Sequence, residues 1–461
     1  MKYFHLIFLY KYIESIFLVE SKYNEAINWA MASKILNNSI DKNIDPCVDF
    51  YQFSCGRWFD YNILYDDEDE VSVESKVEDK IEKELIELLY SNVTFKSRSL
   101  NMVKDIFNKC IKDSKNIRIK EDKESYCLQF IQDNMYTAVD ALYNTKYFSL
   151  EDQRKIKSIV ENLKLSFKEI LKEKSWISDI EKKNSYEKLD KMKTSIGRNI
   201  LLTNSFFLEY YYSPLSISSN DTFNIIKQKL SNFNDTINNN FILEEQYYDE
   251  TKMKINALYI DEINELFVNI PYMKTPFYNR NLPLAMVYGS IGTVIGHEIT
   301  HAFDDDGIKF DKNSIEKQWW SNETMETFYN KSKCFVEQYD KYRTILTKKF
   351  INGTLTLSEN IADSGGLETA YRAYILNNED KLKVPGFEEY TNEQLFFISY
   401  AKSYCSLLSY DFELYNLKND AHPTERYRVI GSISNSNHFS KAFNCKAGSE
   451  MNPIKKCTLW N

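Results

Sequence analysis

A long segment of small and apolar residues leads directly into two histidines, and this segment constrains the fold most. Apolar side chains recur from Ala285 to Ile295, which predicts a buried helix. The helix continues into the five-residue motif HEITH, whose first and last residues are His297 and His301. Residues four apart share one face of a helix, so both imidazoles can reach one ion. The fold must therefore bury a helix that carries two metal-binding side chains.

This histidine spacing is typical of catalytic zinc, which takes three protein ligands and leaves a position for water. The candidate third ligand is Glu359 in SENIADSGG, and Asp363 follows one helical turn later. Asp363 is expected to orient a ligand histidine by hydrogen bonding. Glutamates on helices are also common at solvated surfaces. The residues alone therefore do not decide whether Glu359 is a zinc ligand or an ordinary surface glutamate.

The chemistry expected of such an ion is hydrolysis, because bound zinc lowers the pKa of its water toward about 7. Glu298 lies between the histidines and is the predicted general base, passing the proton to the leaving amine. An oxyanion needs further donors, and His422 and Arg428 in DAHPTERYR are candidates. A histidine and an arginine near a C-terminus more often have a structural role. A structural role for His422 and Arg428 therefore stays an alternative to oxyanion binding.

Chance explains the histidine motif poorly, since only 5 histidines occur in 461 residues. A random HExxH is expected on the order of a few times per thousand such chains.

Composition excludes one class of function and bounds others. The formal charge is −9 without a strongly basic block, which argues against a nucleic-acid partner. The eight cysteines are even in number and form no C-x-x-C pair, so disulfides are expected. N-x-S/T sequons begin at Asn37, Asn92, Asn220, Asn234, Asn322, Asn330 and Asn352. Disulfides and glycans together indicate secretion.

The N-terminus carries no uninterrupted apolar stretch long enough for a membrane anchor. Lys11 and Glu14 interrupt the apolar run that begins at Leu6. We therefore expect a poor signal peptide, or a leader altered by a misplaced start, in place of an anchor.

Helical periodicity dominates the rest of the chain. Apolar residues repeat at helical spacing at Val77, Ile81, Leu85 and Leu88, and again at Ile156, Val160, Leu163, Phe167 and Ile170. Ser178 and Glu181 form a capping box. Two short β-prone runs, 257–260 and 266–270, predict a hairpin. The expected fold is mainly α with a small β component.

These motifs resemble the neprilysin and endothelin-converting enzyme family of zinc peptidases. The similarity is carried by VIGHEITHAFDDDG, SENIADSGG, INALY, QLFF, AKSYC, NDAH and MNPIKKCTLW, and it is nearly continuous from Asn256 to Trp460. The resemblance implies a thermolysin-like zincin catalytic lobe with a second, α-helical lobe. It implies one Zn²⁺ per chain and peptide substrates.

The resemblance also assigns residue roles. It makes His297, His301 and Glu359 the zinc ligands and Glu298 the base. Asp363, Asp304 and Asp420 would hold the zinc-binding and catalytic side chains in position. His422 would stabilise the transition state. Arg428 would donate to the substrate backbone.

Substrate contacts follow from the same similarity. Asn256 and Ala257 would hold the peptide as an added strand. Phe277, Val294, Tyr404 and Tyr272 match the pocket for a large apolar residue after the cleaved bond, although without the resemblance these side chains read as core packing. Tyr404 replaces the tryptophan usual in the family, which changes the expected size of the pocket.

The family pattern implies four disulfides, whereas the sequence alone allows 105 pairings of eight cysteines. The implied pairs are Cys47 with Cys445, Cys55 with Cys405, Cys110 with Cys127, and Cys334 with Cys457.

The chain departs from the family in its middle. Only 111–126 fill the interval where most of the second lobe should lie, either through a real loss or through skipped coding segments. The expected organisation is a leader and N-terminal segment (1–44), an N-terminal part of the catalytic lobe (45–109), a reduced helical lobe (110–250) and the catalytic lobe (251–461). No arginine lies between Glu68 and Lys80, where relatives bind a free carboxylate, so an endopeptidase is expected.

The sequence thus predicts an extracellular zinc metalloendopeptidase that cleaves on the amino side of hydrophobic residues. The alternative is a catalytically silent, secreted zinc-binding protein derived from one. A cell-surface protein anchored by its N-terminus is a second alternative for the location, and the sequence does not indicate the oligomeric state.

Overall fold

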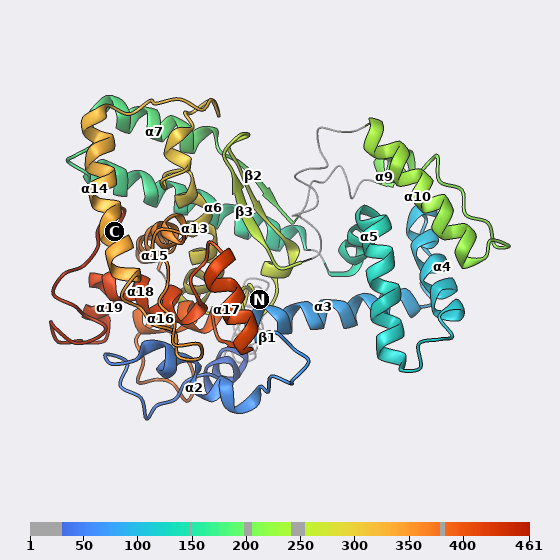
Figure 1. Cartoon of the computed structure of the whole chain (residues 1–461), viewed down its shortest axis with the longest axis horizontal. Helices are drawn as coiled ribbons and strands as arrows, with labels where there is room; N and C mark the ends of the chain where they lie inside the picture. The colour runs from blue at the N-terminus through green and yellow to red at the C-terminus, as the bar shows by residue number, and fades with distance from the viewer. Residues whose placement is uncertain (1–29, 148, 198–204, 241–253, 379–382) are drawn as a thin grey trace, which may run out of the picture. The chain divides into compact units, whose positions relative to one another are not determined.

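The chain forms two compact units, each built from separate stretches of sequence. The computed structural model describes residues 30–147, 149–197, 205–240, 254–378 and 383–461. The first unit comprises 1–73, 160–190 and 275–461, and the second comprises 74–159 and 191–274. Within the described residues the fold is mainly α with few strands, which confirms the predicted class (Figure 1).

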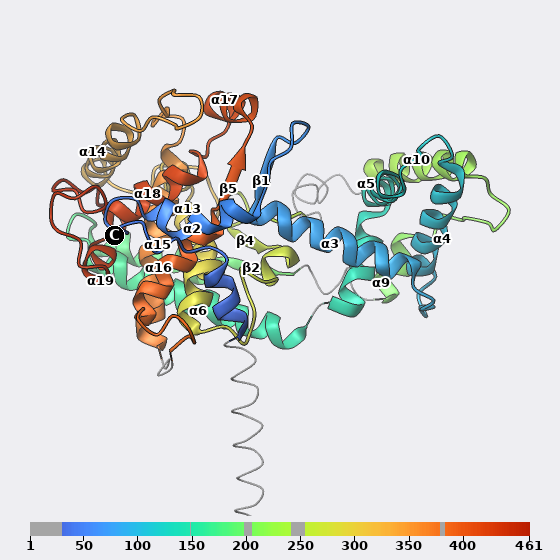
Figure 2. The ribbon, with the colours of Figure 1, turned by 90° about the horizontal axis from the view of Figure 1, so that it is seen from below.

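The first unit contains the histidine helix. Its elements are α2 (Phe50–Tyr61), β1 (Glu70–Ser72), the second half of α6 (Leu150–Glu173), α7 (Asp179–Lys191), α12 (Leu284–Val287), η3 (Tyr288–Gly292), α13 (Thr293–His301), η4 (Gly307–Lys309), α14 (Asn322–Tyr339), α15 (Leu357–Asn377), α16 (Asn392–Ser403), β5 (Ser406–Leu408), α17 (Tyr410–Asn419), α18 (Glu425–Asn435) and α19 (Asn437–Ala442). Strands β1 and β5 pair antiparallel and lie side by side in Figure 2.

The second unit combines helices with a small sheet. Its elements are α3 (Val73–Tyr90), α4 (Arg98–Asp113), α5 (Lys120–Tyr147), the first half of α6, β2 (Lys193–Ile196), α9 (Ser205–Tyr211), α10 (Phe223–Asn240), β3 (Ala257–Ile260), β4 (Glu265–Val268) and η2 (Ile270–Met273). β3 pairs antiparallel with β4, which confirms the predicted hairpin, and β2 adds a parallel third strand.

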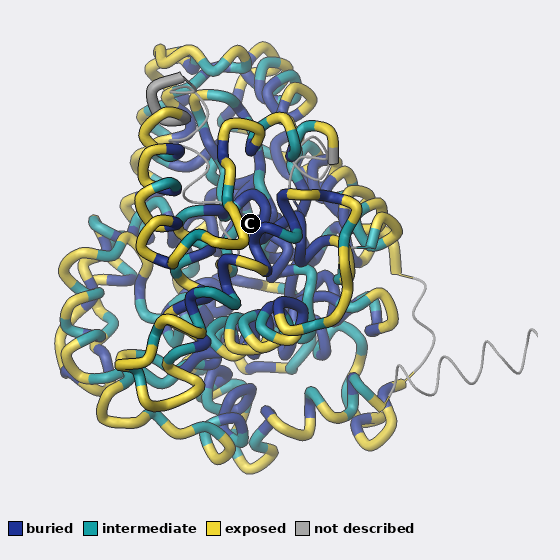
Figure 3. Tube along the Cα trace, turned by 90° about the vertical axis from the view of Figure 1, so that its right-hand side faces the viewer, coloured by how far each residue is buried: buried dark blue, intermediate teal, exposed yellow. Residues whose placement is uncertain are grey.

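The helices follow the apolar periodicity of the sequence. All the periodic residues named above in 77–88 and 156–170 are buried. Figure 3 shows how buried and exposed residues alternate along single helices, because one face of each packs inward. The capping box before α7 is confirmed, since Ser178 N donates to Glu181 Oε2 (2.9 Å) and Glu181 N donates to Ser178 Oγ (3.4 Å).

The segment before the histidines is helical and mostly buried, as its composition predicts, with Leu284 and Val294 partly exposed. It begins after Pro283 as α12, widens into the π-helical turn η3, and continues as α13. Gly289 lies in the wide turn, where an added Cβ would come within 2.1 Å of the carbonyl oxygen of Phe396. The glycine therefore lets the segment pack directly on the backbone of α16.

Aromatic packing ties the C-terminus to the core of the first unit. Trp460 is buried, contacts the rings of Phe167 and Trp176, and donates from Nε1 to the Phe303 carbonyl (3.0 Å). These contacts hold the C-terminal residues next to the segment that follows the histidine helix.

Four disulfides join Cys47 to Cys445, Cys55 to Cys405, Cys110 to Cys127 and Cys334 to Cys457. These are the pairs that the family resemblance implies. Two of them bind the N-terminal segment to the histidine-bearing unit, across sequence separations of 398 and 350 residues.

The two compact units are composed differently from the four expected segments, whose boundaries stay a prediction. Residues 74–109 and 251–274 belong to the second unit, whereas 160–190 belong to the first. Helical periodicity predicts which face of a helix is buried, but it does not predict which part of the chain covers that face. In α6, for example, Phe167 packs on Phe303 and Trp460 of the first unit. Of the expected leader and N-terminal segment (1–44), residues 1–29 lie outside the described residues. Within the described residues, no helix has both the length and the apolar character needed to cross a bilayer.

Candidate metal site

Close backbone contact between α13 and α15 brings the predicted ligands together. A Cβ on Gly296 would come within 2.7 Å of the Gly366 carbonyl oxygen, and one on Gly366 within 2.4 Å of the His297 nitrogen. Only glycine at both positions permits this approach. Glu359 lies about two turns and Asp363 about one turn before Gly366 on α15, so the contact holds them beside the histidines.

The two histidines and Glu359 converge on one point. The Nε2 atoms of His297 and His301 are 2.9 Å apart. Glu359 Oε2 lies 3.1 Å from His297 Nε2, and its Oε1 lies 3.7 Å from His301 Nε2. All three side chains are largely buried, with 8%, 18% and 11% of their surface exposed. The structure therefore places Glu359 within reach of both imidazoles.

The far nitrogens of both imidazoles are held by carboxylates. His297 Nδ1 lies 2.9 Å from Asp363 Oδ1, and His301 Nδ1 lies 2.6 Å from Asp304 Oδ2. With each Nδ1 donating to its carboxylate, each Nε2 presents a lone pair toward the other. Two lone pairs at this separation repel each other unless a proton or a metal cation lies between them. The arrangement could hold a metal ion, and its nitrogen and carboxylate donors fit zinc.

Glu359 supplies an independent test of that fit. Its Oε2 is buried and has no hydrogen bond of acceptable geometry in the structure, although imidazole nitrogens lie 3.1 and 3.0 Å away. A buried acceptor without a donor is costly, whereas a shared cation would satisfy it. The nitrogen and carboxylate donors are also those that zinc prefers.

The electrostatics of the cluster favour positive charge at the convergence point. Burial lowers the pKa of His301, but Glu359 and Asp304 outweigh it and raise that pKa to about 10. Burial opposes ionisation of Asp363, yet Arg428 and His297 lower its pKa to about 2. The pKa of Glu359 is held well below its usual range by the histidines, again against burial. A dication would occupy the place where these groups already stabilise positive charge.

The side chain of Glu298 lies beside the two histidines and has no hydrogen-bond partner among the described residues. Its side chain is 6% exposed, and one carboxylate oxygen lies within 4.8 Å of ligand nitrogens of both His297 and His301. Within the part of the chain that the structure describes, it makes no hydrogen bond. Its carboxylate is therefore uncommitted beside the convergence point.

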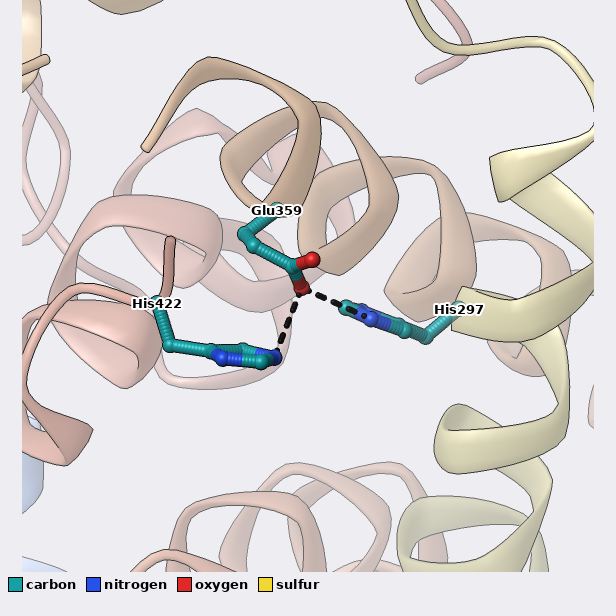
Figure 4. Close-up of side chains that lie close together, drawn as sticks. All are labelled: His297, Glu359 and His422. Carbon is teal, nitrogen blue, oxygen red and sulfur yellow. Dashed lines mark ion pairs between the residues drawn. The ribbon is translucent and has the colours of Figure 1, made fainter. Parts of the chain in front are cut away.

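His422 approaches the same point from the loop after α17. Its Nε2 lies 3.0 Å from Glu359 Oε2, and its Nδ1 lies 2.9 Å from Asp420 Oδ1. Figure 4 shows the Glu359 carboxylate between the imidazoles of His422 and His297. Burial and Arg428 lower the pKa of His422, but Asp420 and Glu359 raise it to about 9.

This closeness of His422 to Glu359 was not foreseen. His297, Glu359 and His422 form a second group of three donors that could hold an ion. The sequence names His422 as a candidate oxyanion donor, but it gives no signal for a direct contact with Glu359, because the two residues are far apart along the chain.

Arg428 supports the site through Asp363. Its Nε and Nη2 donate to the two oxygens of Asp363 at 2.9 and 2.7 Å. The guanidinium also lies over the Tyr404 ring, 5.0 Å from its centroid. Its predicted contact with a substrate backbone stays a prediction, and anchoring Asp363 is a role that the sequence did not suggest.

The predicted pocket residues occupy different environments. Val294 is partly exposed on α13, and Tyr404 follows α16 beside Arg428. Phe277 is only 1% exposed and packs in the core. Asn256, Ala257 and Tyr272 belong to the second unit, where the Tyr272 hydroxyl donates to Glu74. The substrate roles of all six stay predictions.

Known proteins resemble this chain over most of its length. Two models described as "Peptidase family M13" match it, one over residues 256–459 and one over 46–120 and 114–199. Membrane metallo-endopeptidase-like 1 of Mus musculus is 33% identical over 74% of this chain and 46% of its own length. Endothelin-converting enzyme 1 of Bos taurus is 34% identical over 73% of this chain and 45% of its own. The chain thus spans less than half the length of these curated relatives.

Solved structures share the fold. A zinc metalloprotease of Mycobacterium tuberculosis in complex with an inhibitor is 25% identical with a TM-score of 0.62, over 74% of this chain and 51% of that one. A chain of the Haemonchus galactose-containing glycoprotein complex has a TM-score of 0.76 at 17% identity, covering 94% of this chain and 99% of its own. The second match shows the fold alone, in a chain of similar extent.

Proposed function

This chain belongs to peptidase family M13, and we propose that it is a zinc-dependent endopeptidase. The observation that carries the proposal is the convergence of His297 Nε2, His301 Nε2 and Glu359 on one point, with the carboxylate of Glu298 beside them. A catalytic zinc needs three such ligands and a neighbouring base.

The ligands in this proposal are His297, His301 and Glu359. Bound zinc would polarise the scissile carbonyl and make the attacking water more acidic. Asp363 and Asp304 fix the ring orientation of the two histidines, because each accepts from an Nδ1. Arg428 in turn fixes Asp363.

Glu298 is the proposed general base. Its carboxylate is free of hydrogen bonds to the described residues and lies next to the ligand nitrogens, so it can take a proton from water. The same group can then return the proton to the leaving amine.

His422 is the proposed donor to the developing oxyanion. Asp420 lies 2.9 Å from its Nδ1 and, together with Glu359, raises its pKa to about 9, so Nε2 can carry the hydrogen that is donated to the oxyanion. With 44% of its side chain exposed, it faces solvent and can reach a bound peptide. Removing one donor to the oxyanion of a tetrahedral transition state typically costs about 3 kcal/mol.

Specificity and location belong to the same proposal. The partly exposed Val294 and the Tyr404 ring favour an apolar side chain after the cleaved bond. Asn256 and Ala257 would pair with the substrate backbone. Four disulfides favour an oxidising, extracellular setting, in which the sequons could carry glycans.

The test compares the wild-type chain with Glu298→Gln on a quenched peptide that contains one large apolar residue. We expect the variant to lose about 10²- to 10⁴-fold in turnover while its bound zinc, measured by mass spectrometry of the metal, is unchanged. Glu326→Gln, an exposed carboxylate on α14, is the matched control. Equal turnover in wild type and Glu298→Gln, or cleavage that survives complete zinc removal, would reject the mechanism. A zinc-loaded wild type without any cleavage would support a silent binding protein.

A further inference from the structure

Strand β5 has one edge paired and one edge open. Ser409 N donates to Asp69 O (2.8 Å), and Val73 N donates to Cys405 O (3.0 Å). In an antiparallel pair, hydrogen-bonded residue pairs alternate with pairs whose backbone groups point outward. The register places Leu408 opposite Glu70 and so between two bonded positions. The N–H and C=O of Leu408 therefore point away from β1.

The opposite edge of the strand is partly used by a side chain. Ser406 also lies at an outward-pointing position, and its N–H donates to the Tyr51 hydroxyl (3.1 Å). That bond independently fixes the direction of the open edge. Leu408 has no comparable partner among the described residues. An unpaired strand edge of this kind can accept an added strand.

A cavity lies along this edge. It has a volume of about 380 Å³, and its lining includes Ser406, Leu407 and Leu408. Ile345 and Leu346 form its apolar rim, with 58% and 44% of their surfaces exposed. Exposed apolar side chains beside unpaired backbone groups suit an extended peptide, which brings both kinds of partner.

The charges in the cavity favour a cationic occupant. Glu413, Glu425 and Arg426 line it, but Arg426 is already paired with Asp49 (2.6 Å). Glu413 accepts from the Thr347 backbone (2.8 Å), and Glu425 accepts from the Ser406 hydroxyl (3.2 Å). Neither carboxylate has a cationic partner within ion-pair distance in the described chain. The cavity therefore carries an excess of negative charge.

The pKa of the Glu425 carboxyl group is raised by its surroundings. Burial and the nearby Glu70 raise its pKa to about 7, although Arg428 acts in the opposite direction. A lysine or arginine side chain of a ligand would relieve this repulsion.

We propose that this cavity, the β5 groove, binds an extended peptide segment in which apolar residues alternate with basic ones. The peptide backbone pairs with Leu408, its apolar side chains cover Ile345 and Leu346, and a basic side chain pairs with Glu425. The occupant adds a third strand to β1 and β5.

The β5 groove is separate from the proposed zinc ligands, none of which lines it. It lies close to Tyr404, whose carbonyl accepts from the Tyr51 hydroxyl (3.0 Å). The proposal goes beyond peptide cleavage and does not depend on it, since a silent protein would bind the same segment.

The test uses a fluorescein-labelled, end-blocked peptide of alternating valine and lysine. Its anisotropy is followed on the zinc-loaded full chain carrying Glu298→Gln, so that the probe is not consumed. We expect saturable binding that a zinc-directed peptide hydroxamate does not displace. Glu425→Gln, which keeps the side-chain shape, should weaken binding about tenfold. Glu450→Gln, an exposed carboxylate outside the cavity, should leave it unchanged.

Two further probes test the strand pairing without changing the protein. The same peptide N-methylated at alternate residues cannot pair with β5 and should not bind, and a peptide with glutamate in place of lysine should fail as well. Displacement by the hydroxamate would assign the binding to the zinc site and overturn the proposal. So would equal binding of the N-methylated probe, an unaltered affinity in Glu425→Gln, or a dimer that pairs through β5 and excludes the peptide.

Discussion

Arg428 holds both carboxylate oxygens of Asp363, and Asp363 holds Nδ1 of His297. One arginine on α18 therefore sets the orientation of a proposed zinc ligand on α13. Arg428→Met should weaken zinc affinity about 10- to 100-fold, because Asp363 loses its anchor. Competition with a chromophoric chelator measures the change. Arg428→Lys should recover only part, since lysine cannot make the two-point contact, and Arg118→Met at an exposed position should have no effect.

Contact between α13 and α15 depends on Gly366. Gly366→Ala would place a Cβ within 2.4 Å of the His297 nitrogen, so the two helices must separate. We expect a loss of roughly 1–3 kcal/mol in unfolding free energy together with loss of zinc binding. Gly292→Ala is the matched control, because its Cβ would meet only the Tyr288 side chain, at 3.2 Å. Retention of full zinc affinity in Gly366→Ala would refute the proposed role of the contact.

Lys188 is fully buried and donates from Nζ to the carbonyls of Ala302, Gly307 and Phe310 at 2.9, 2.8 and 2.9 Å. These carbonyls bracket the loop that carries Asp304. Lys188→Met would leave them without that donor, at a cost of roughly 1–3 kcal/mol for each group left unsatisfied. Thermal unfolding should show a clear drop in melting temperature. Lys312→Met, which removes a partly exposed lysine, should change it little.

The disulfides should differ in their contribution to stability. Cys110 and Cys127 close a separation of 17 residues, whereas Cys55 and Cys405 close one of 350. Chain entropy predicts a loss of about 3 kcal/mol when serines replace the first pair and about 4 for the second, because the remaining Cys47–Cys445 bond already shortens the loop that the second pair closes. Chemical denaturation of the two double variants would measure both. A larger loss from the short loop would contradict this ordering.

Glu425 should make stability depend on pH. Burial and Glu70 raise its pKa to about 7 in the folded chain, above the value of about 4.3 expected when unfolded. Between these values the folded state retains a proton that the unfolded state has lost. This group's contribution is therefore fully present below about pH 4 and is lost as the pH rises toward 7. Glu425→Gln should flatten that part of the stability profile, and an unchanged slope would contradict the assignment.

The sequence predicts local features of this protein well. Helices appear where apolar residues repeat, and the hairpin at Ala257–Val268 and the capping box at Ser178 form as expected. These features depend on neighbours in the chain, so the local pattern contains them.

Features that depend on distant contacts were harder to predict. The residues alone left Glu359 undecided, because its approach to His297 rests on the packing of Gly296 against Gly366. The pairing of Arg428 with Asp363 and the position of His422 beside Glu359 likewise join residues far apart in sequence. Family resemblance supplied the ligand set and the expectation of two lobes, and the residues that make up each unit became visible only in the fold.

The most direct measurement is anomalous diffraction at the zinc edge from crystals of the zinc-loaded chain. The account predicts one peak per chain, about 2.0–2.2 Å from His297 Nε2, His301 Nε2 and a Glu359 oxygen, with the Glu298 carboxylate unbound beside it. A peak held by His297, Glu359 and His422 without His301, or no peak between the histidines, would contradict it.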